Sequence, residues 1–303
     1  MVEKTEKDIY RLYYKIGDIT IQVESEIPIS DETFIPRFKA FAVNGPGDDN
    51  VVIRHHFSLP DIDESDMGKE VYNNLPWKIY RKDDSWMYLC ASNVGNQKQI
   101  YQMSVFSHDH KSARIYNRSD QRFQKGGMTS FGLYTNDQIL IAQLLAHRNG
   151  CYMHSSGVSM DGKGILFIGR SGVGKSTITK MVEDQSRVIC DEMIILRRYP
   201  HEYRIYGTWN YSEFPDVYPG YVPLKAIFFL EQAKDNYIVE VKDKKEIIKR
   251  LLGCLVRPFV TANWWNNTLD LLENISSEVP CFVLHFDKSG QIVDHIKKTL
   301  KSL

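Results

Sequence analysis

The chain has 303 residues, 43% apolar and 25% charged, a composition that is typical of folded globular proteins and excludes collagen-like and disordered chains. Its 38 basic and 38 acidic residues give a formal net charge of zero, so a broad nucleic-acid-binding surface, which needs clustered excess base, is not expected. No run approaches the ~18 apolar residues of a membrane-spanning helix, and the first residues lack the apolar core of a secretory signal. The five cysteines form no C-x-x-C pair, which indicates a reducing, cytoplasmic environment.

The first region, residues 1–130, is predicted to be rich in β-strands. Over residues 19–24, apolar and polar side chains alternate with the period of a half-buried strand. Asp83 and Asp84 predict a hairpin turn, and an antiparallel sheet is the expected result. We expect this region to recognise an acceptor or to assemble subunits. The predicted strands are 19–24, 38–43, 51–57, 77–82, 86–90, 102–106 and 113–116.

The second region, residues 131–303, mixes helices with strands. A capping-box pattern at 135–138 predicts a helix that Asn149 and Gly150 close. The turn sequence DGKG at 161–164 predicts a hairpin. The later predicted elements are strands at 158–160, 165–168, 187–190, 226–230 and 281–286, and helices at 175–183, 246–256 and 263–276, the last with Trp265, Leu269, Leu272 and Ile275 on its buried face.

One motif carries specific chemistry. Residues 169–176, GRSGVGKS, match the P-loop pattern G-x-x-x-x-G-K-[ST], between an apolar strand and a helix-compatible segment. Its glycines let backbone N–H groups surround phosphate, while Lys175 reaches the β- and γ-phosphates and Ser176 can bind Mg²⁺. A glycine turn without a ligand is the structural alternative. The predicted ATP-binding residues are Gly169, Arg170, Ser171, Gly172, Val173, Gly174, Lys175, Ser176 and Thr177.

An acidic pair, Asp191 and Glu192, follows the predicted strand at 187–190. The short distance in sequence from Lys175 leaves room for one helix and one strand. One acid would hold Mg²⁺, and the other would accept the proton of an attacking hydroxyl group. An exposed acid pair at a strand end is the simpler alternative. His154, shortly before the loop, is by itself most often a structural residue.

These motifs together resemble a known family. The order of His154, the turn at 161–164, the P-loop and the acidic pair is similar to the catalytic half of HPr kinase/phosphorylase, which phosphorylates a serine of a phosphocarrier protein. Most of the chain resembles the bacterial HPr-kinase-like, phosphoenolpyruvate-carboxykinase-like proteins more closely. The shared motifs are RNG (148–150), HSSG (154–157), GTW (207–209), RP (257–258), WW (264–265) and FDKSG (286–290).

The resemblance implies an α/β (α+β) fold with a P-loop core of the HPr kinase/phosphoenolpyruvate carboxykinase type and a β-rich N-terminal region. It also implies that Lys175, Ser176 and the loop glycines bind ATP and Mg²⁺. Asp191 would be a metal ligand or base, Glu192 would share that task, and His154 would lie beside the γ-phosphate. Because some relatives phosphorylate a serine of a ribosomal peptide, a peptide acceptor is expected. HPr kinases are hexamers, which suggests a homo-oligomer.

Several positions differ from the family pattern. Arg170 stands where HPr kinases often have Asp, and Glu192 is longer than the usual second Asp. The signature of the loop with which HPr kinases bind HPr is not found. Arg257, at a predicted helix end, is a candidate for neutralising charge on the transferring phosphoryl group, or else a surface arginine.

The sequence therefore predicts an ATP-dependent kinase that phosphorylates a hydroxyl group, preferably serine, of a peptide, protein or small molecule. A nucleotide-dependent sensor or scaffold that binds ATP without phosphotransfer is one alternative. A phosphoenolpyruvate carboxykinase is another, although those enzymes are much larger and need a dedicated oxaloacetate and Mn²⁺ site.

Overall fold

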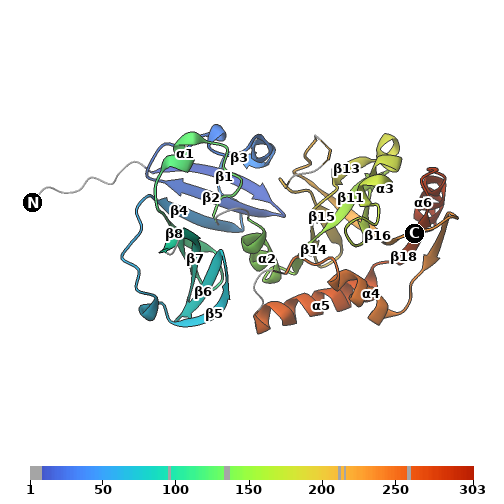
Figure 1. Cartoon of the computed structure of the whole chain (residues 1–303). Helices are drawn as coiled ribbons and strands as arrows, with labels where there is room; N and C mark the ends of the chain where they lie inside the picture. Colours follow the sequence, from blue (N-terminus) through green and yellow to red (C-terminus); the bar gives the residue numbers. More distant parts are fainter. Residues whose placement is uncertain (1–8, 95–96, 133–136, 211–212, 215, 258–260) are drawn as a thin grey trace, which may run out of the picture. The chain divides into compact units, whose positions relative to one another are not determined.

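The computed structural model describes residues 9–94, 97–132, 137–210, 213–214, 216–257 and 261–303 (Figure 1). The chain forms two compact units that divide between Leu144 and Leu145, C-terminal to the predicted boundary at 130/131. Both units contain a large sheet with helices, so the expected mixture of strands and helices is confirmed. No helix in these ranges is long and apolar enough to span a membrane.

The first unit is built on a sheet that has nine strands within the described residues. They are β1 (Tyr10–Ile16), β2 (Ile19–Ser25), β3 (Ala42–Val43), β4 (Asn50–His56), β5 (Lys69–Asn74), β6 (Trp77–Lys82), β7 (Ser85–Val94), β8 (Gln97–Ser107) and β9 (Ser112–Asn117), in the order β3-β1-β2-β4-β9-β8-β7-β6-β5. The prediction of an antiparallel sheet is partly wrong, because β4 pairs in parallel with both β2 and β9. Two short 3-10 helices between β2 and β4 return the chain to the same end of the sheet.

Most predicted strands of this region are confirmed, and the strand at 38–43 is wrong. Pro36–Phe41 forms a 3-10 helix, and only Ala42–Val43 is a strand. Phe38 and Phe41 are buried at the three-residue spacing of a 3-10 turn, not at the two-residue spacing of a strand. The hairpin at Asp83 and Asp84 is confirmed, since Lys82 pairs with Ser85 across it.

The second unit contains a mixed sheet in the order β10-β14-β15-β16-β12-β11-β13, with β18 beside β16 and β17 beside β18. The strands are β10 (Gly150–Met153), β11 (Ser155–Met160), β12 (Lys163–Ile168), β13 (Arg187–Cys190), β14 (Ile194–Arg198), β15 (Tyr203–Tyr206), β16 (Tyr221–Gln232), β17 (Tyr237–Glu240) and β18 (Cys281–Phe286). The helices are α3 (Lys175–Val182), α4 (Lys244–Leu252), α5 (Ala262–Glu278) and α6 (Ile292–Lys301). Two short helices precede them along the chain, α1 (Gln121–Lys125) and α2 (Gln138–Ala146).

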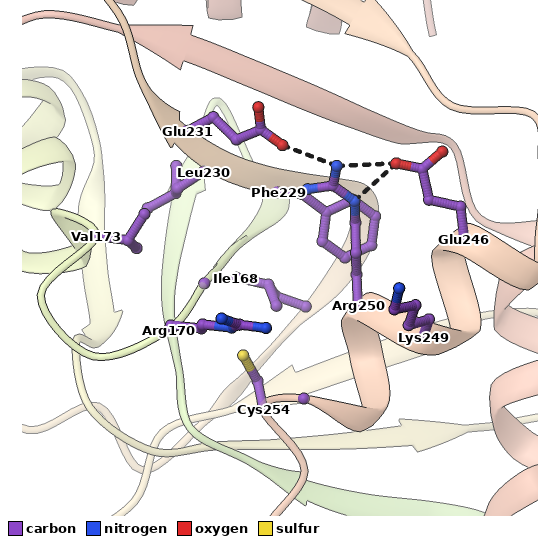
Figure 2. Close-up of a pocket in the computed structure, with 12 residues that line it drawn as sticks. Ile168, Arg170, Val173, Phe229, Leu230, Glu231, Glu246, Lys249, Arg250 and Cys254 are labelled. Carbon is purple, nitrogen blue, oxygen red and sulfur yellow. Dashed lines mark hydrogen bonds and ion pairs between the residues drawn. The ribbon is translucent and has the colours of Figure 1, made fainter.

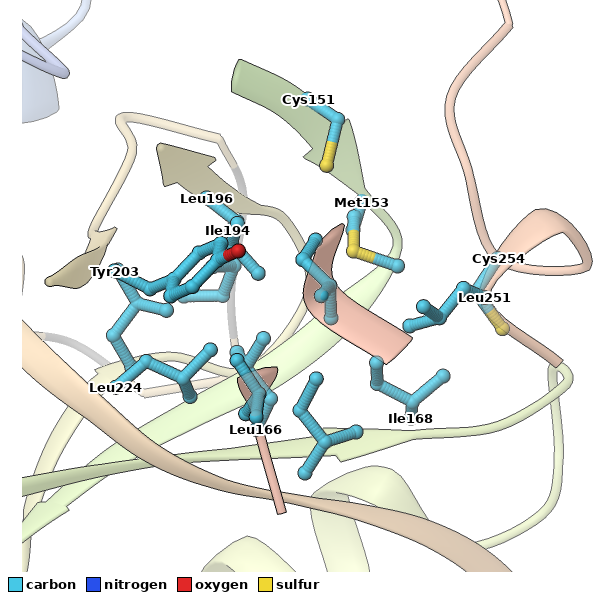
Figure 3. Close-up of a cluster of buried hydrophobic side chains, with 14 of the residues drawn as sticks. Cys151, Met153, Leu166, Ile168, Ile194, Leu196, Tyr203, Leu224, Leu251 and Cys254 are labelled. Carbon is cyan, nitrogen blue, oxygen red and sulfur yellow. The ribbon is translucent and has the colours of Figure 1, made fainter. Parts of the chain in front are cut away.

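Strand β12 is buried on both faces, as expected for a central strand with near-continuous apolar sequence. Ile165 and Phe167 pack into a cluster with α3 and α6. Leu166 and Ile168 pack on the opposite face, in a cluster with α4 and α5 (Figure 3). The helices thus cover both faces of the sheet and leave the carboxyl ends of its parallel strands open.

The parallel strands β12, β13, β16 and β18 all end at one edge of this sheet. Strand β11 is antiparallel to β12 and β13, so its first residues lie at the same edge. Ligands of open α/β sheets bind at this edge, outside the carboxyl ends of the strands. The P-loop motif, His154 and the acidic pair therefore meet there.

Several predicted elements of the second region differ in their ends. The helix expected over 246–256 ends at Leu252, and Leu255 instead forms a bridge with Met153 of β10. The helix predicted to end at Asn149 ends at Ala146. Residues 135 and 136 of the predicted capping box lie outside the described residues. The hairpin at 161–164 is confirmed, with Met160 paired to Lys163.

The predicted buried face of α5 is confirmed at Leu272 and Ile275 and wrong at Leu269. Leu272 and Ile275 are buried, Trp265 is partly buried, and Leu269 is 41% exposed, whereas Trp264, Thr268 and Leu271 are buried as well. Apolar residues stand on both sides of this helix, so periodicity alone does not define the edges of its buried face. The packing of α5 against α4 and the sheet selects the face that is observed.

Leu271 and Leu269 test this assignment. Because Leu271 is 3% exposed, we expect Leu271→Ala to lower the free energy of unfolding by about 2–5 kcal/mol through lost burial and a cavity. Leu269→Ala is the matched control, with an expected change within about 0.5 kcal/mol. Urea unfolding of both variants gives the two values, and an equal loss for both would contradict the observed face.

Candidate functional site

The glycine loop, residues 169–174, connects β12 to α3. Gly172 and Gly174 have φ values of 79° and 109°, which other residues rarely adopt. A Cβ atom at Gly174 would also lie 2.9 Å from Cζ of Phe286. The first intrahelical hydrogen bond runs from the Ile178 N–H to the Gly174 carbonyl at 2.9 Å, so the N–H groups at the start of α3 have no intrahelical acceptor. This arrangement is the one that the motif needs for binding an anion.

Lys175, the first residue of α3, is 6% exposed. Its Nζ donates to the carbonyl oxygen of Gly169 at 3.1 Å and lies 3.5 Å from that of Arg170. Burial lowers the pKa of its ammonium group, and the neighbouring Cys254 and Glu192 oppose this shift in part. Among the described residues no carboxylate forms an ion pair with Nζ. A buried cation that only carbonyls satisfy favours a bound anion beside it.

His154 and Glu192 lie near Lys175. Nδ1 of His154 is 3.1 Å from Oε1 of Glu192, whose side chain is 46% exposed. Burial and then the charge of Lys175 lower the pKa of His154, while Glu192 raises it. The His154 N–H donates to the Cys254 carbonyl at 2.8 Å, which fixes its backbone position. The structure therefore brings these two predicted residues together.

Asp191 lies near two lysines of α3, Lys175 and Lys180. Asp191 is 2% exposed, and its charge contributes to a raised pKa of Lys180, for which the hydrogen bond to Glu213 is the largest cause. Nζ of Lys180 is 2.8 Å from Oε2 of Glu213. The pKa of Glu213 is lowered first by this lysine and also by a hydrogen bond from Ser176. Both acids of the pair thus lie near Lys175, and they differ in exposure.

Glu213 and Cys254 were not identified from the sequence. Glu213 has no motif around it, and only the tertiary structure brings it to Lys180 of α3. Cys254 is buried, and its thiol also lies against the glycine loop. Burial raises its pKa, and Lys175 and the Gly169 N–H lower it in part. Cys254 reaches the glycine loop because residues 254–256 pair with β10 and the residue that follows it, a long-range contact that the sequence pattern does not reveal.

A pocket of about 410 Å³, which we call the loop-side pocket, adjoins the glycine loop on the side of β16 and α4 (Figure 2). Arg170 and Cys254 point into it, and Arg250 crosses its far wall. Nη2 of Arg250 is 2.8 Å from Oε1 of both Glu231 and Glu246. The lining residues are Ile168, Gly169, Arg170, Val173, Phe229, Leu230, Glu231, Glu246, Lys249, Arg250, Gly253 and Cys254.

The two arginines that the sequence predicts at the site, Arg170 and Arg257, lie in different surroundings. Arg170 is exposed and lines the loop-side pocket. Arg257 is also exposed, directly after the segment that pairs with β10, and its side chain has no hydrogen bond or ion pair with the residues the structure describes. Its role towards a phosphoryl group stays a prediction. Ser171, Gly172 and Val173 form the centre of the glycine loop, and Thr177 follows in the first turn of α3.

Residues 133–301 match the family model described as "SynChlorMet cassette protein ScmC". The chain is 29% identical over 113 residues to an HPr kinase/phosphorylase of Chlorobium phaeobacteroides (strain BS1), covering 35% of this chain and 33% of that protein. It is 32% identical over 91 residues to an HPr kinase/phosphorylase of Prosthecochloris aestuarii (strain DSM 271 / SK 413), covering 29% of this chain and 27% of that protein. The matches thus span about a third of the length of these curated relatives.

Among solved structures, the HPr(Ser) kinase/phosphatase from Coxiella burnetii matches with a TM-score of 0.29 and 10% identity, over 50% of this chain and 93% of that one. The resemblance to HPr kinase that the motifs suggested is confirmed by the sequence matches.

The electrostatic coupling around His154 can be tested directly. Lys175→Met removes a positive charge near His154, so we expect the pKa of His154 to rise; Glu192→Gln removes a negative charge, so we expect it to fall. NMR titration of the imidazole protons measures both shifts, with the exposed His295 as an internal control. Shifts of the same sign in the two variants would contradict the arrangement.

Proposed function

The chain belongs to the family of the SynChlorMet cassette protein ScmC and is HPr-kinase-like, and from this we propose that it is an ATP-dependent kinase that phosphorylates a hydroxyl group. The expected acceptor is a serine of a peptide or protein, or a small molecule. We further propose that the second unit is a P-loop core of the HPr kinase type. The observation that carries the proposal is the buried Lys175 beside the glycine loop, with Glu192 and Asp191 near enough to oppose the lowering of its pKa.

The residues of the glycine loop fit a nucleotide triphosphate. The open N–H groups at the start of α3 and the positive-φ glycines suit phosphate oxygens. Nζ of Lys175 now donates to the Gly169 carbonyl, and it would exchange that bond for a phosphate oxygen. Lys175 would then neutralise charge on the β- and γ-phosphates.

The site also fits Mg²⁺, which prefers oxygen ligands and typically takes one or two carboxylates together with substrate phosphates. The Ser176 hydroxyl and the buried Asp191 carboxylate would hold the ion, with Glu213 beside Ser176. Bound there, Mg²⁺ would supply charge neutralisation and orientation of the phosphates.

Glu192 is then the proposed base. The acceptor oxygen attacks the γ-phosphorus, the bond from that phosphorus to the β–γ bridging oxygen breaks, and ADP leaves with the electron pair. The hydroxyl proton passes to the Glu192 carboxylate. His154, 3.1 Å from Glu192, holds this carboxylate in place. This division of the acidic pair follows from exposure, because Asp191 is 2% exposed whereas the side chain of Glu192 is 46% exposed and open to an acceptor.

A sensor that binds ATP without phosphotransfer is the second candidate. The observation that favours it is the contact between Glu192 and His154, because a carboxylate that is occupied by an imidazole has to leave this contact before it can take a proton from an acceptor. Nucleotide binding without phosphate on any acceptor would support it. The acceptor, a homo-oligomeric state and a role of residues 1–130 in acceptor recognition or assembly stay predictions.

Lys175→Ala tests the kinase. We expect phosphotransfer to fall by about 10²–10³-fold or more, because the charge on the transferring group loses its nearest cation. Intact-mass spectrometry of an acceptor panel of peptides, HPr and free serine after incubation with Mg-ATP measures it. Lys298→Ala, which removes an exposed lysine of α6, is the control. Unchanged turnover in Lys175→Ala would overturn the proposal.

The proposed roles of Glu192 and Asp191 can be tested separately. We expect Glu192→Gln to lower kcat by about 10²–10⁴-fold, the usual contribution of a general base, with little change in Mg²⁺ affinity. Asp191→Asn should instead weaken Mg²⁺ binding in the presence of nucleotide. Kinetics together with Mg²⁺ titration distinguish the variants, and a reversed pattern would exchange the two roles.

A further inference from the structure

The loop-side pocket lies next to the place where the transferred phosphoryl group is expected. Gly169 and Arg170, whose carbonyls surround Nζ of Lys175, both line the pocket. Since this lysine contacts the terminal phosphates in P-loop enzymes, a molecule in the pocket would stand beside the reacting group. This inference rests on the proposed function.

The pocket adjoins the segment that holds the backbone of His154. Cys254 lines the pocket, and its carbonyl accepts the N–H of His154 at 2.8 Å. His154 in turn contacts Glu192. An acceptor bound in the pocket would therefore need to extend past Cys254 to bring its hydroxyl group to the carboxylate that takes its proton.

The charges in the pocket are not balanced. Both of its carboxylates, Glu231 and Glu246, contact the guanidinium of Arg250 (Figure 2). Arg170 and Lys249 are exposed, and neither forms an ion pair with another residue that the structure describes. Two cations without carboxylate partners at the mouth of a pocket favour a ligand that carries carboxylates.

The size and floor of the pocket indicate what carries those carboxylates. Its volume of about 410 Å³ is within the ~300–1,000 Å³ of ligand pockets. Its floor is apolar, formed by Ile168, Val173, Phe229 and Leu230. A free hydroxy acid would leave this apolar floor uncovered, whereas a short peptide segment could cover it with a neighbouring side chain.

We propose that the loop-side pocket binds the acceptor as an acidic peptide segment. A carboxylate near the acceptor serine interacts with Lys249 and Arg170, an apolar side chain packs on Phe229 and Leu230, and the serine hydroxyl points towards Glu192. The transfer step is the one given above, with the serine oxygen as the attacking atom. Lys249 is then a residue that determines specificity, because it contacts the acceptor and neither the nucleotide nor the metal.

The test uses the full chain with Mg-ATP and a positional-scanning library of serine peptides, in which each position near the serine carries Asp, Ala or Lys. We expect Asp to be preferred over Lys at one or more positions by about fivefold, the upper value for a single exposed ion pair. Lys249→Glu should reverse the preference by raising KM for acidic peptides. Lys245→Glu, the same charge change on α4 outside the pocket, should keep it.

The outcomes separate this proposal from the proposed function. An equal use of Asp and Lys peptides, or an acidic preference that Lys249→Glu leaves intact, overturns the acidic-peptide pocket. Phosphorylation of free serine or other small hydroxy acids without any peptide also overturns it, as does Mg-ATP binding with no product in any arm. Absence of Mg-ATP binding by calorimetry is a failure of the proposed function itself. A thermal melt of Lys249→Glu confirms that the variant is folded.

Discussion

The buried ammonium group of Lys175 is the charge on which the arrangement of the second unit's site depends. An ammonium group in this position loses most of its hydration, and the carbonyl of Gly169 is its only hydrogen bond within 3.1 Å among the described residues. Glu192 and Asp191 lie near enough to this ammonium group to oppose the lowering of its pKa. The same burial that lowers the pKa of Lys175 makes an anion at the glycine loop favourable.

This cation can lie at the sheet edge because both faces of β12 are covered. Alternate residues of the strand pack against α3 and α6 on one face and against α4 and α5 on the other. The strand therefore ends in a fixed position, and the glycine loop begins from a rigid base. The parallel neighbours of β12 end at the same edge, which is why residues far apart in sequence can act at one place.

Residues 254–256, which belong to no helix or strand, make two contacts at this edge of the sheet. Residues 254–256 follow α4 and pair with β10, so that the Cys254 carbonyl holds the His154 backbone while its thiol lies against the glycine loop. Because Cys254 also lines the loop-side pocket, this segment joins the wall of the pocket to the backbone of His154.

Local features of the chain can be predicted from the sequence alone. The glycine loop and its helix follow from residues whose backbone preferences act within a few positions, such as Gly174, where φ is positive. The hairpin at 161–164 and the buried run of β16 depend on equally local patterns. The alternation at 19–24 correctly predicts a strand, but its half-buried exposure is wrong, because β2 is covered on both faces and Thr20 and Glu24 are only 2% and 3% exposed. Contacts between distant segments cannot be predicted in this way, because apolar periodicity indicates that a face is buried but not which element covers it. For that reason periodicity predicts burial for Leu269 of α5, which is exposed, and misses Leu271, which is buried. It also predicts a strand where Pro36–Phe41 forms a 3-10 helix. Glu213, Cys254 and Lys249 lie near the site only because the tertiary structure brings together segments that are distant in sequence.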